Sequence, residues 1–248
     1  MRQIAGVLGA CALAALVCGC AGRKDDTVKM ITEATFPPYE FLRGQEIVGI
    51  DVEICRAVAA KLGKKFQCET VDFDSVIPAV ISGKADLAAA GITVTEDRRK
   101  NVDFSDPYVK TGIVVVYKKD NPFRDREQLK GQKIGVQSGT TSEAFVTDAL
   151  RQEPERAKSP AEAVAALKAG RVAFVIADVD PAKNCVKGEE SLAISDFITS
   201  EEYAIAIRKG QPELLQAINA TIAEIKADGR LAQWVKAFTE ESDRLKEK

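Results

Sequence analysis

Polar residues that could bind a charged small molecule follow three predicted strands. The first strand runs into Thr93 and then Arg98, which supplies a fixed cation. The second ends at Gln137 and leads through residues 138–141 into a helix, whose first N–H groups have no partner within the helix. The third ends at Asp178, a fixed anion. Ligands of open α/β sheets bind at such strand ends, and this set suits a zwitterion with one carboxylate and one ammonium group.

Each of these residues also has a simpler structural interpretation. Arg98 begins the basic triplet Arg98-Arg99-Lys100, and such runs are usually a solvated surface. Asp178 could cap the helix that follows it, and Thr141 could be only a first-turn residue. The residues alone leave both interpretations open.

Composition narrows the classes of function. The chain has 248 residues and no histidine, which excludes Ser-His-Asp triads, Cys-His pairs and nearly every catalytic zinc site. Lys and Arg total 35 and Asp and Glu total 37, so no basic excess favours nucleic acid. An enzyme would have to use carboxylate, lysine, tyrosine or cysteine chemistry. We expect no metal and no cofactor.

The segments that must position the polar residues alternate between strand and helix. This order predicts an α/β protein with largely parallel sheets. Asp51 is expected to be the N-cap of the first helix, and Thr140 and Glu143 have the spacing of a capping box. The expected strands are 28–34, 66–71, 86–90, 113–117, 133–137, 172–177 and 203–207, and the expected helices are 51–62, 74–82, one from Thr140, 160–169, 214–225 and 230–238.

The N-terminus has the pattern of an export signal. The apolar stretch 4–17 is too short to span a bilayer and has the length of a signal-peptide core. It is followed by Val-Cys-Gly-Cys, which resembles a bacterial lipobox and implies cleavage after Gly19 and lipidation of Cys20. The alternative is an ordinary secretory signal peptide that is cleaved nearby and leaves a soluble protein without lipid. We therefore expect a lipoprotein signal over 1–19 and a tether over 20–26.

Three cysteines remain in the mature chain. The positions of Cys55 and Cys68 allow a disulfide that leaves Cys185 alone, and they also fit three buried thiols. Their spacing does not match a metal cluster.

Six segments, in order, resemble the periplasmic polar-amino-acid-binding proteins, which are the family 3 extracellular solute receptors of ABC importers. The resemblance covers nearly everything after residue 27, and several segments are long enough to be specific. They are TFPPYEF (35–41), VGIDVEICRAVAAKLGKK (48–65), FDSVIPAVISGKADLAAAGITVTEDRRKNVDFSDPY (73–108), IGVQSGTT (134–141), GRVAFVIAD (170–178) and ADGRLAQWVKAF (227–238).

The resemblance implies a two-lobed, type II periplasmic-binding-protein fold, in which each lobe is a mostly parallel sheet flanked by helices. Lobe 1 would be residues 27–110 plus 205–248, and lobe 2 would be residues 111–204. Two crossing segments near 108–112 and 202–206 would form the hinge. A ligand between the lobes would hold them closed.

The resemblance also implies roles for residues around the ligand's head group. Arg98 matches the arginine that pairs with the α-carboxylate, and Asp178 matches the acid that binds the α-ammonium. Gly91 and Thr93 match positions around the head group. Thr141 matches the lobe 2 position that meets the carboxylate.

Four further residues match the pocket for the ligand's side chain. Phe36 and Phe73 match the two aromatics that sandwich it, Glu33 faces its tip, and Gln137 tunes the pocket. The alternative is that the aromatics belong to the core and that Glu33 is an ordinary strand-end charge. Two rings and an acid suit arginine or lysine, and glutamine is the close competitor.

By this resemblance the protein is not an enzyme. It would act as a monomer that is anchored by lipid in the periplasm or cell envelope and passes a free L-amino acid to an ABC permease. Two other functions stay open: a periplasmic cyclohexadienyl dehydratase that uses Glu33 as acid or base, and a ligand sensor.

Overall fold

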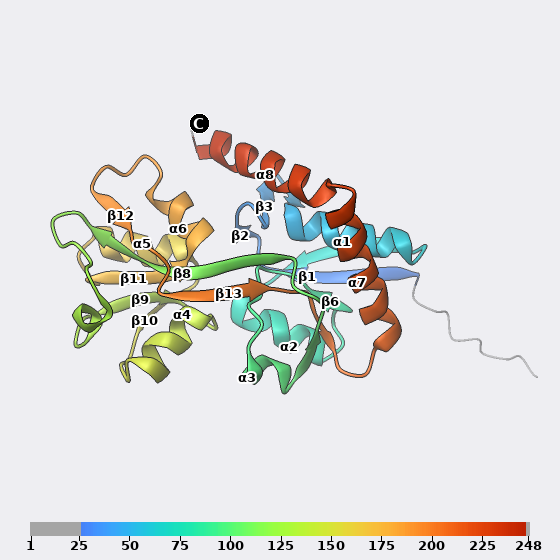
Figure 1. The fold of residues 1–248 in the computed structure, drawn as a ribbon, viewed down its shortest axis with the longest axis horizontal. Coiled ribbons are helices and arrows are strands. Elements are labelled where there is room, and N and C mark those ends of the chain that lie inside the picture. Colours follow the sequence, from blue (N-terminus) through green and yellow to red (C-terminus); the bar gives the residue numbers. More distant parts are fainter. Residues whose placement is uncertain (1–25, 247–248) are drawn as a thin grey trace, which may run out of the picture.

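The computed structural model describes residues 26–246, which form two sheets side by side with helices packed against both (Figure 1). One sheet has the strand order β5, β1, β6, β14, β7, and the other has the order β10, β9, β11, β8, β12, with β13 paired to β8. The bounds are β1 Thr27–Thr32, β5 Lys65–Thr70, β6 Leu87–Ala88, β7 Val102–Phe104, β8 Val109–Lys118, β9 Ile134–Gln137, β10 Glu155–Ala157, β11 Phe174–Asp178, β12 Leu192–Ile194, β13 Thr199–Tyr203 and β14 Ala206–Arg208.

The two-lobed α/β fold is confirmed, but each sheet is mixed rather than mostly parallel. In the first sheet β5, β1 and β6 are parallel, whereas β14 is antiparallel to both its neighbours. In the second sheet β10, β9 and β11 are parallel, whereas β8 is antiparallel to β11, β12 and β13. The reason is the crossing of the chain between lobes. β8 begins at the lobe boundary and runs away from it, while β9 and β11 run toward it.

Helices cover the sheets, and central strands such as β9 and β11 are buried on both faces. Alternate residues of β11 belong to different clusters, with Phe174 and Ile176 in one and Val175 and Ala177 in another, as the period of a strand requires. This explains the almost continuous apolar runs in the sequence. The helices are α1 Ile50–Lys61, α2 Val76–Ile81, α3 Glu96–Arg99, α4 Thr141–Ala144, α5 Pro160–Lys168, α6 Val179–Val186, α7 Pro212–Ala227 and α8 Arg230–Lys246, with short 3₁₀ or π segments at Phe73–Ser75, Arg126–Leu129 and Phe145–Ala149.

A small antiparallel sheet precedes the first helix, which starts differently from the prediction. It contains β2 Thr35–Phe36, β3 Glu40–Arg43 and β4 Glu46–Val48. The N-cap of α1 is Gly49, not Asp51. Gly49 has φ 137°, and a Cβ there would lie 2.1 Å from the carbonyl oxygen of Tyr39, so only glycine fits. Asp51 therefore lies inside the first turn, where it is fully buried.

The predicted strand over 203–207 is two strands. β13 ends at Tyr203 in the second sheet, and β14 begins at Ala206 in the first, because this segment crosses from one lobe to the other. The other crossing lies between the end of β7 and the start of β8. The Tyr108 N–H donates to the Tyr203 carbonyl at 3.0 Å and joins the two crossings. The lobe boundaries at 110/111 and 204/205 stay a prediction.

Other predicted features have definite outcomes. Cys55 and Cys68 are both thiols, so they form no disulfide with each other. The Thr140 side chain accepts from the Glu143 N–H at 3.3 Å, but the Glu143 carboxylate accepts from Gly139 rather than from the cap residue. The predicted signal over 1–19 and Cys20 lie outside the described residues. Within residues 26–246, no helix is long and apolar enough to cross a membrane.

Candidate functional site

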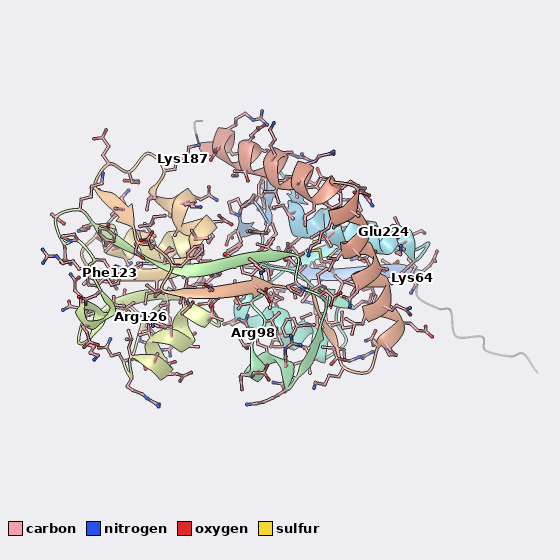
Figure 2. All side chains as sticks on the ribbon, in the orientation of Figure 1. Lys64, Arg98, Phe123, Arg126, Lys187 and Glu224 are labelled. Carbon is pink, nitrogen blue, oxygen red and sulfur yellow. The ribbon has the colours of Figure 1, made fainter. Side chains whose placement is uncertain are left out.

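Arg98 joins the two lobes. The Thr95 side chain caps α3 by accepting from the Arg98 N–H, which fixes the start of the arginine side chain. Its guanidinium donates to the Thr93 carbonyl at 2.8 Å and, across the cleft, to the Gly139 carbonyl at 3.0 Å (Figure 2). Its carbon lies 5.6 Å from the centre of the Phe73 ring. Arg98 is thus a partly buried cation between the lobes, unlike the solvated cation that a basic triplet suggests.

Asp178 is a buried acid on the opposite lobe. It ends β11, is 8% exposed, and accepts the Tyr203 hydroxyl at 2.6 Å. It occupies the N-cap position of α6, yet its side chain makes no capping bond. Burial, followed by the charge of Glu201, raises the pKa of Asp178 to about 7, whereas the bond from Tyr203 and the charge of Arg98 act to lower it. A cationic group beside Asp178 would be strongly favoured, because it would stabilise the ionised carboxylate.

Glu201 is a second acid in this region that the sequence did not indicate. Its carboxylate accepts the Thr93 hydroxyl at 2.7 Å, so the hydroxyl expected near the ligand is bonded to Glu201 in this arrangement. Glu201 lies on β13, whose sequence TSEEY resembles a solvent-facing strand. The position of Glu201 in the sequence could have indicated this role, because it lies two residues before Tyr203, close to the segment where the chain crosses between the lobes.

Glu33 and Gln137 meet from opposite lobes. Each is 5% exposed. One Glu33 oxygen accepts the Thr35 hydroxyl, and the other is buried with no hydrogen-bond partner among residues 26–246. Burial raises the pKa of Glu33, and the hydrogen bond from Thr35 and the nearby Gln137 amide oppose that rise. An acid with a free buried oxygen can receive a donor from a ligand.

The aromatic residues are arranged differently from a simple sandwich. Phe36 packs over Gly91, where a Cβ would lie 2.7 Å from the ring, and it adjoins Tyr39 and Tyr203 with ring centres 5.9 and 6.2 Å away. Phe73 lies against Arg98. The two tyrosines were missed by the sequence interpretation. Their signal was present, since Tyr39 lies within the TFPPYEF segment that contains Phe36.

Gly91 and Thr141 offer backbone groups. Gly91 has φ 53°, and its N–H donates to the Asp51 carboxylate at 2.9 Å, which leaves its carbonyl oxygen for a ligand. Thr141 is the first residue of α4, after the Thr140 cap. N–H groups in a first helical turn have no intrahelical acceptor and favour an anion.

Further contacts join the lobes along one face of α6. Asp180 accepts the Tyr39 hydroxyl at 2.8 Å, and Asn184 donates to the Pro37 carbonyl at 2.7 Å. Lys187, which is labelled in Figure 2, pairs with Asp243 of α8 at 2.8 Å. These lobe 2 residues recur at intervals of four and three, which places them on one side of the helix. Together with the Arg98 contact they show that the lobes are closed on each other.

Arg98 and Asp178 place complementary charges between two lobes that the chain joins at two crossings, an arrangement that suits a small charged ligand. A family model described as "Bacterial extracellular solute-binding proteins, family 3" matches residues 28–241. The chain belongs to this family.

Relatives and solved structures agree with this assignment. The arginine-binding extracellular protein ArtP of Bacillus subtilis is 32% identical and aligns with 94% of this chain and 95% of its own length. The L-arginine-bound substrate-binding protein AbpA of Streptococcus pneumoniae has TM-score 0.81 and 31% identity, covering 88% of this chain and 96% of that one. An ancestral arginine-binding protein bound to glutamine has TM-score 0.79 and 41% identity, covering 86% and 97%.

The buried acids predict how the stability of the ligand-free protein depends on pH. The pKa values of Asp178 and Asp51 are raised to about 7 and about 6 by burial, and burial also raises those of Glu33 and Glu40. An acid whose pKa is higher in the folded state stabilises that state below its unfolded pKa of about 4 and loses this contribution as the pH rises through the folded value.

The melting temperature of the ligand-free protein should therefore fall between about pH 4 and pH 7, by an amount equivalent to a few kcal/mol. The opposing carboxylates, Glu46 and Asp228, have lowered pKa values but are exposed, so they contribute little. Calorimetry across this range checks the prediction, and a melting temperature that rises steadily would contradict it.

Proposed function

We propose that this chain captures a free amino acid between its lobes and presents it to the permease of an ABC importer. The single observation that best supports this is the placement of Arg98 and Asp178, a partly buried cation and a buried acid that interact electrostatically between the lobes without forming a direct salt bridge. The favoured ligands are arginine and lysine, followed by glutamine.

Arg98 would bind the ligand's α-carboxylate. Two of its five N–H donors are used by the Thr93 and Gly139 carbonyls, and the remaining donors suit a carboxylate. The first-turn N–H groups at Thr141 would meet the same carboxylate from lobe 2. Asp178 would receive the α-ammonium, with the carbonyl of Gly91 as a second acceptor.

Glu33 and Gln137 would contact the end of the ligand's side chain and select for its chemistry. The unpartnered buried oxygen of Glu33 favours a donor, and its carboxylate favours a cation. This supports guanidinium or ammonium above an amide, and it disfavours an acidic side chain. Phe36 would supply the apolar wall, with Phe73 acting chiefly as a support for Arg98.

Capture would work through a shift in population. A ligand that bridges Arg98 of lobe 1 to Asp178 of lobe 2 makes both sets of contacts only when the lobes are closed. The contacts of α6 with Tyr39, Pro37 and Asp243 add to the same closed state. The permease would then receive the ligand from the closed protein.

A thermal-shift measurement against the twenty amino acids tests this function. A ligand that binds only the native state raises its melting temperature, so arginine or lysine should give the largest shift and glutamine a smaller one. The protein should first be unfolded and refolded to remove any bound ligand. Stabilisation by glutamate but not by arginine or lysine would reject the ligand assignment.

One observation keeps a dehydratase-like enzyme as the second candidate. The raised pKa of Glu33 and its free oxygen are properties of a general acid. The presence of Asp178 beside the head group favours plain binding, because a prephenate-like substrate has no ammonium to pair with it. Measurable turnover of prephenate would reverse this preference.

We also propose that the mature chain is a monomer held at the cell envelope by lipid on Cys20. The support is the lipobox pattern at 17–20 and the family's extracellular location. In cells expressing the full chain, Cys20→Ser should move the protein from the membrane fraction to the soluble fraction. An unchanged membrane fraction would argue against the anchor.

A further inference from the structure

We propose that Tyr203 is a positioning residue: its hydroxyl holds the Asp178 carboxylate where that carboxylate can receive the α-ammonium group of the ligand. The proposal rests on the function proposed above, and it concerns a residue that would not itself touch the ligand's charged groups.

The Tyr203 side chain is rigidly placed. It is fully buried, and its ring packs edge-on to Tyr39 at 5.1 Å and to Phe36 at 6.2 Å between centres. Its backbone is held as well, since its carbonyl accepts the Tyr108 N–H at 3.0 Å and it forms a β-bridge with Thr93. A hydroxyl fixed in this way defines one direction for its hydrogen-bond acceptor.

That acceptor is Asp178, at 2.6 Å from the hydroxyl to Oδ1. An aspartate at an N-cap normally turns its carboxylate onto the first N–H groups of the helix. Asp178 is the N-cap of α6 and makes no such bond. The Tyr203 hydroxyl gives Oδ1 a partner outside the helix, an arrangement that would leave Oδ2 for the ligand.

The same bond helps to keep Asp178 ionised. The charged and titratable groups that face Asp178 are Glu201 and Tyr203 from β13 and Arg98 from α3. Glu201 raises the pKa of Asp178, and the other two lower it. Removing the hydroxyl would therefore release the carboxylate toward α6 and also favour its neutral form, and both effects weaken the attraction for an ammonium group.

Tyr108 provides a matched control. It lies on the other crossing segment, is 5% exposed, and donates its hydroxyl at 2.7 Å to another buried aspartate, Asp51. Tyr108→Phe and Tyr203→Phe each delete one oxygen from equivalent surroundings. Only Tyr203 bonds to the acid proposed to bind the ammonium.

The test compares L-arginine with 5-guanidinopentanoate, the same molecule without its amino group, by calorimetric titration. Tyr203→Phe should weaken the binding of L-arginine about tenfold or more, which is the loss expected when a hydrogen bond to a charged group is removed. It should change the binding of 5-guanidinopentanoate less than about threefold. Tyr108→Phe should discriminate between the two ligands much less than Tyr203→Phe does, because Tyr108 reaches the ammonium site only indirectly, through Asp51 and Gly91. Adding Tyr203→Phe to Asp178→Asn should cause less than about a twofold further loss of arginine affinity.

Each other outcome has a definite meaning. If Tyr203→Phe weakens both ligands equally, or neither, Tyr203 does not position Asp178. If it does not fold, the double variant compared with Asp178→Asn decides, because Asp178→Asn removes the buried charge that Tyr203→Phe alone leaves without its donor. A further large loss in the double variant overturns the proposal. If the unmodified protein binds 5-guanidinopentanoate as tightly as L-arginine, the assigned role of Asp178 fails, which identifies an error in the proposed function itself.

Discussion

Arg98→Ala should cost about 2–5 kcal/mol of amino-acid binding, as when one partner of a desolvated charge pair is removed. This is a loss of about thirtyfold to a few thousandfold in affinity. The variant removes the proposed partner of the ligand's carboxylate and also the lobe-to-lobe contact with the Gly139 carbonyl. Isothermal titration with L-arginine measures the loss.

Arg99→Ala is the matched control for this prediction. Arg99 lies over Phe104 at 5.7 Å and pairs with Glu96 on the exposed side of α3, away from the cleft. Its removal should leave the affinity within about twofold, because exposed ion pairs contribute little. An Arg98→Ala protein that binds within twofold of the unmodified protein would refute the role of Arg98.

Asp178→Asn should weaken L-arginine binding at least about thirtyfold and change its dependence on pH. The pKa of Asp178 is raised to about 7 when the lobes are in contact without ligand, and in its proposed role the ionised carboxylate binds the ligand's ammonium. Below pH 7 a proton must leave before the ligand binds, so affinity should fall by up to about tenfold per pH unit as the pH drops. Titrations from pH 5.5 to pH 7.5 should show this fall in the unmodified protein and a smaller one in Asp178→Asn.

Glu201→Gln provides an independent check on this electrostatic account. The charge of Glu201 raises the pKa of Asp178, so its removal should move the midpoint of the affinity profile to lower pH. A glutamine can still accept the Thr93 hydroxyl, so the local geometry is kept. A midpoint that stays in place would show that Asp178 does not control the profile.

The sequence predicted the parts of the site that depend on strand ends. Arg98, Gln137 and Asp178 follow buried strands, and parallel strands bring their carboxyl ends to the same edge of a sheet. The apolar runs, glycines and prolines also located the central strands and long helices, but not the short strands β2, β3, β4, β7, β10 and β12, and α8 runs to Lys246 rather than to residue 238. Local patterns sufficed there because burial and helix capping are decided by neighbouring residues.

The residues that the sequence did not indicate are those whose roles depend on distant partners. Asp51 had the local pattern of an N-cap, but Gly49 is the N-cap of α1. The Asp51 carboxylate instead accepts hydrogen bonds from the Gly91 N–H and the Tyr108 hydroxyl, which come from remote segments. Glu201 lies in β13, whose sequence TSEEY is typical of an exposed strand. Tyr203 was placed within one continuous strand, although the chain there changes from one sheet to the other.

The central claim, that the protein closes on a zwitterion through Arg98 and Asp178, is tested most directly by calorimetric titration of refolded, ligand-free protein. L-arginine should bind with one molecule per chain. Agmatine, which has the same guanidinium end but no carboxylate, should bind at least about thirtyfold more weakly because Arg98 has no anion to pair with. Agmatine binding as tight as that of L-arginine, or no heat from any of the twenty amino acids, would contradict the account.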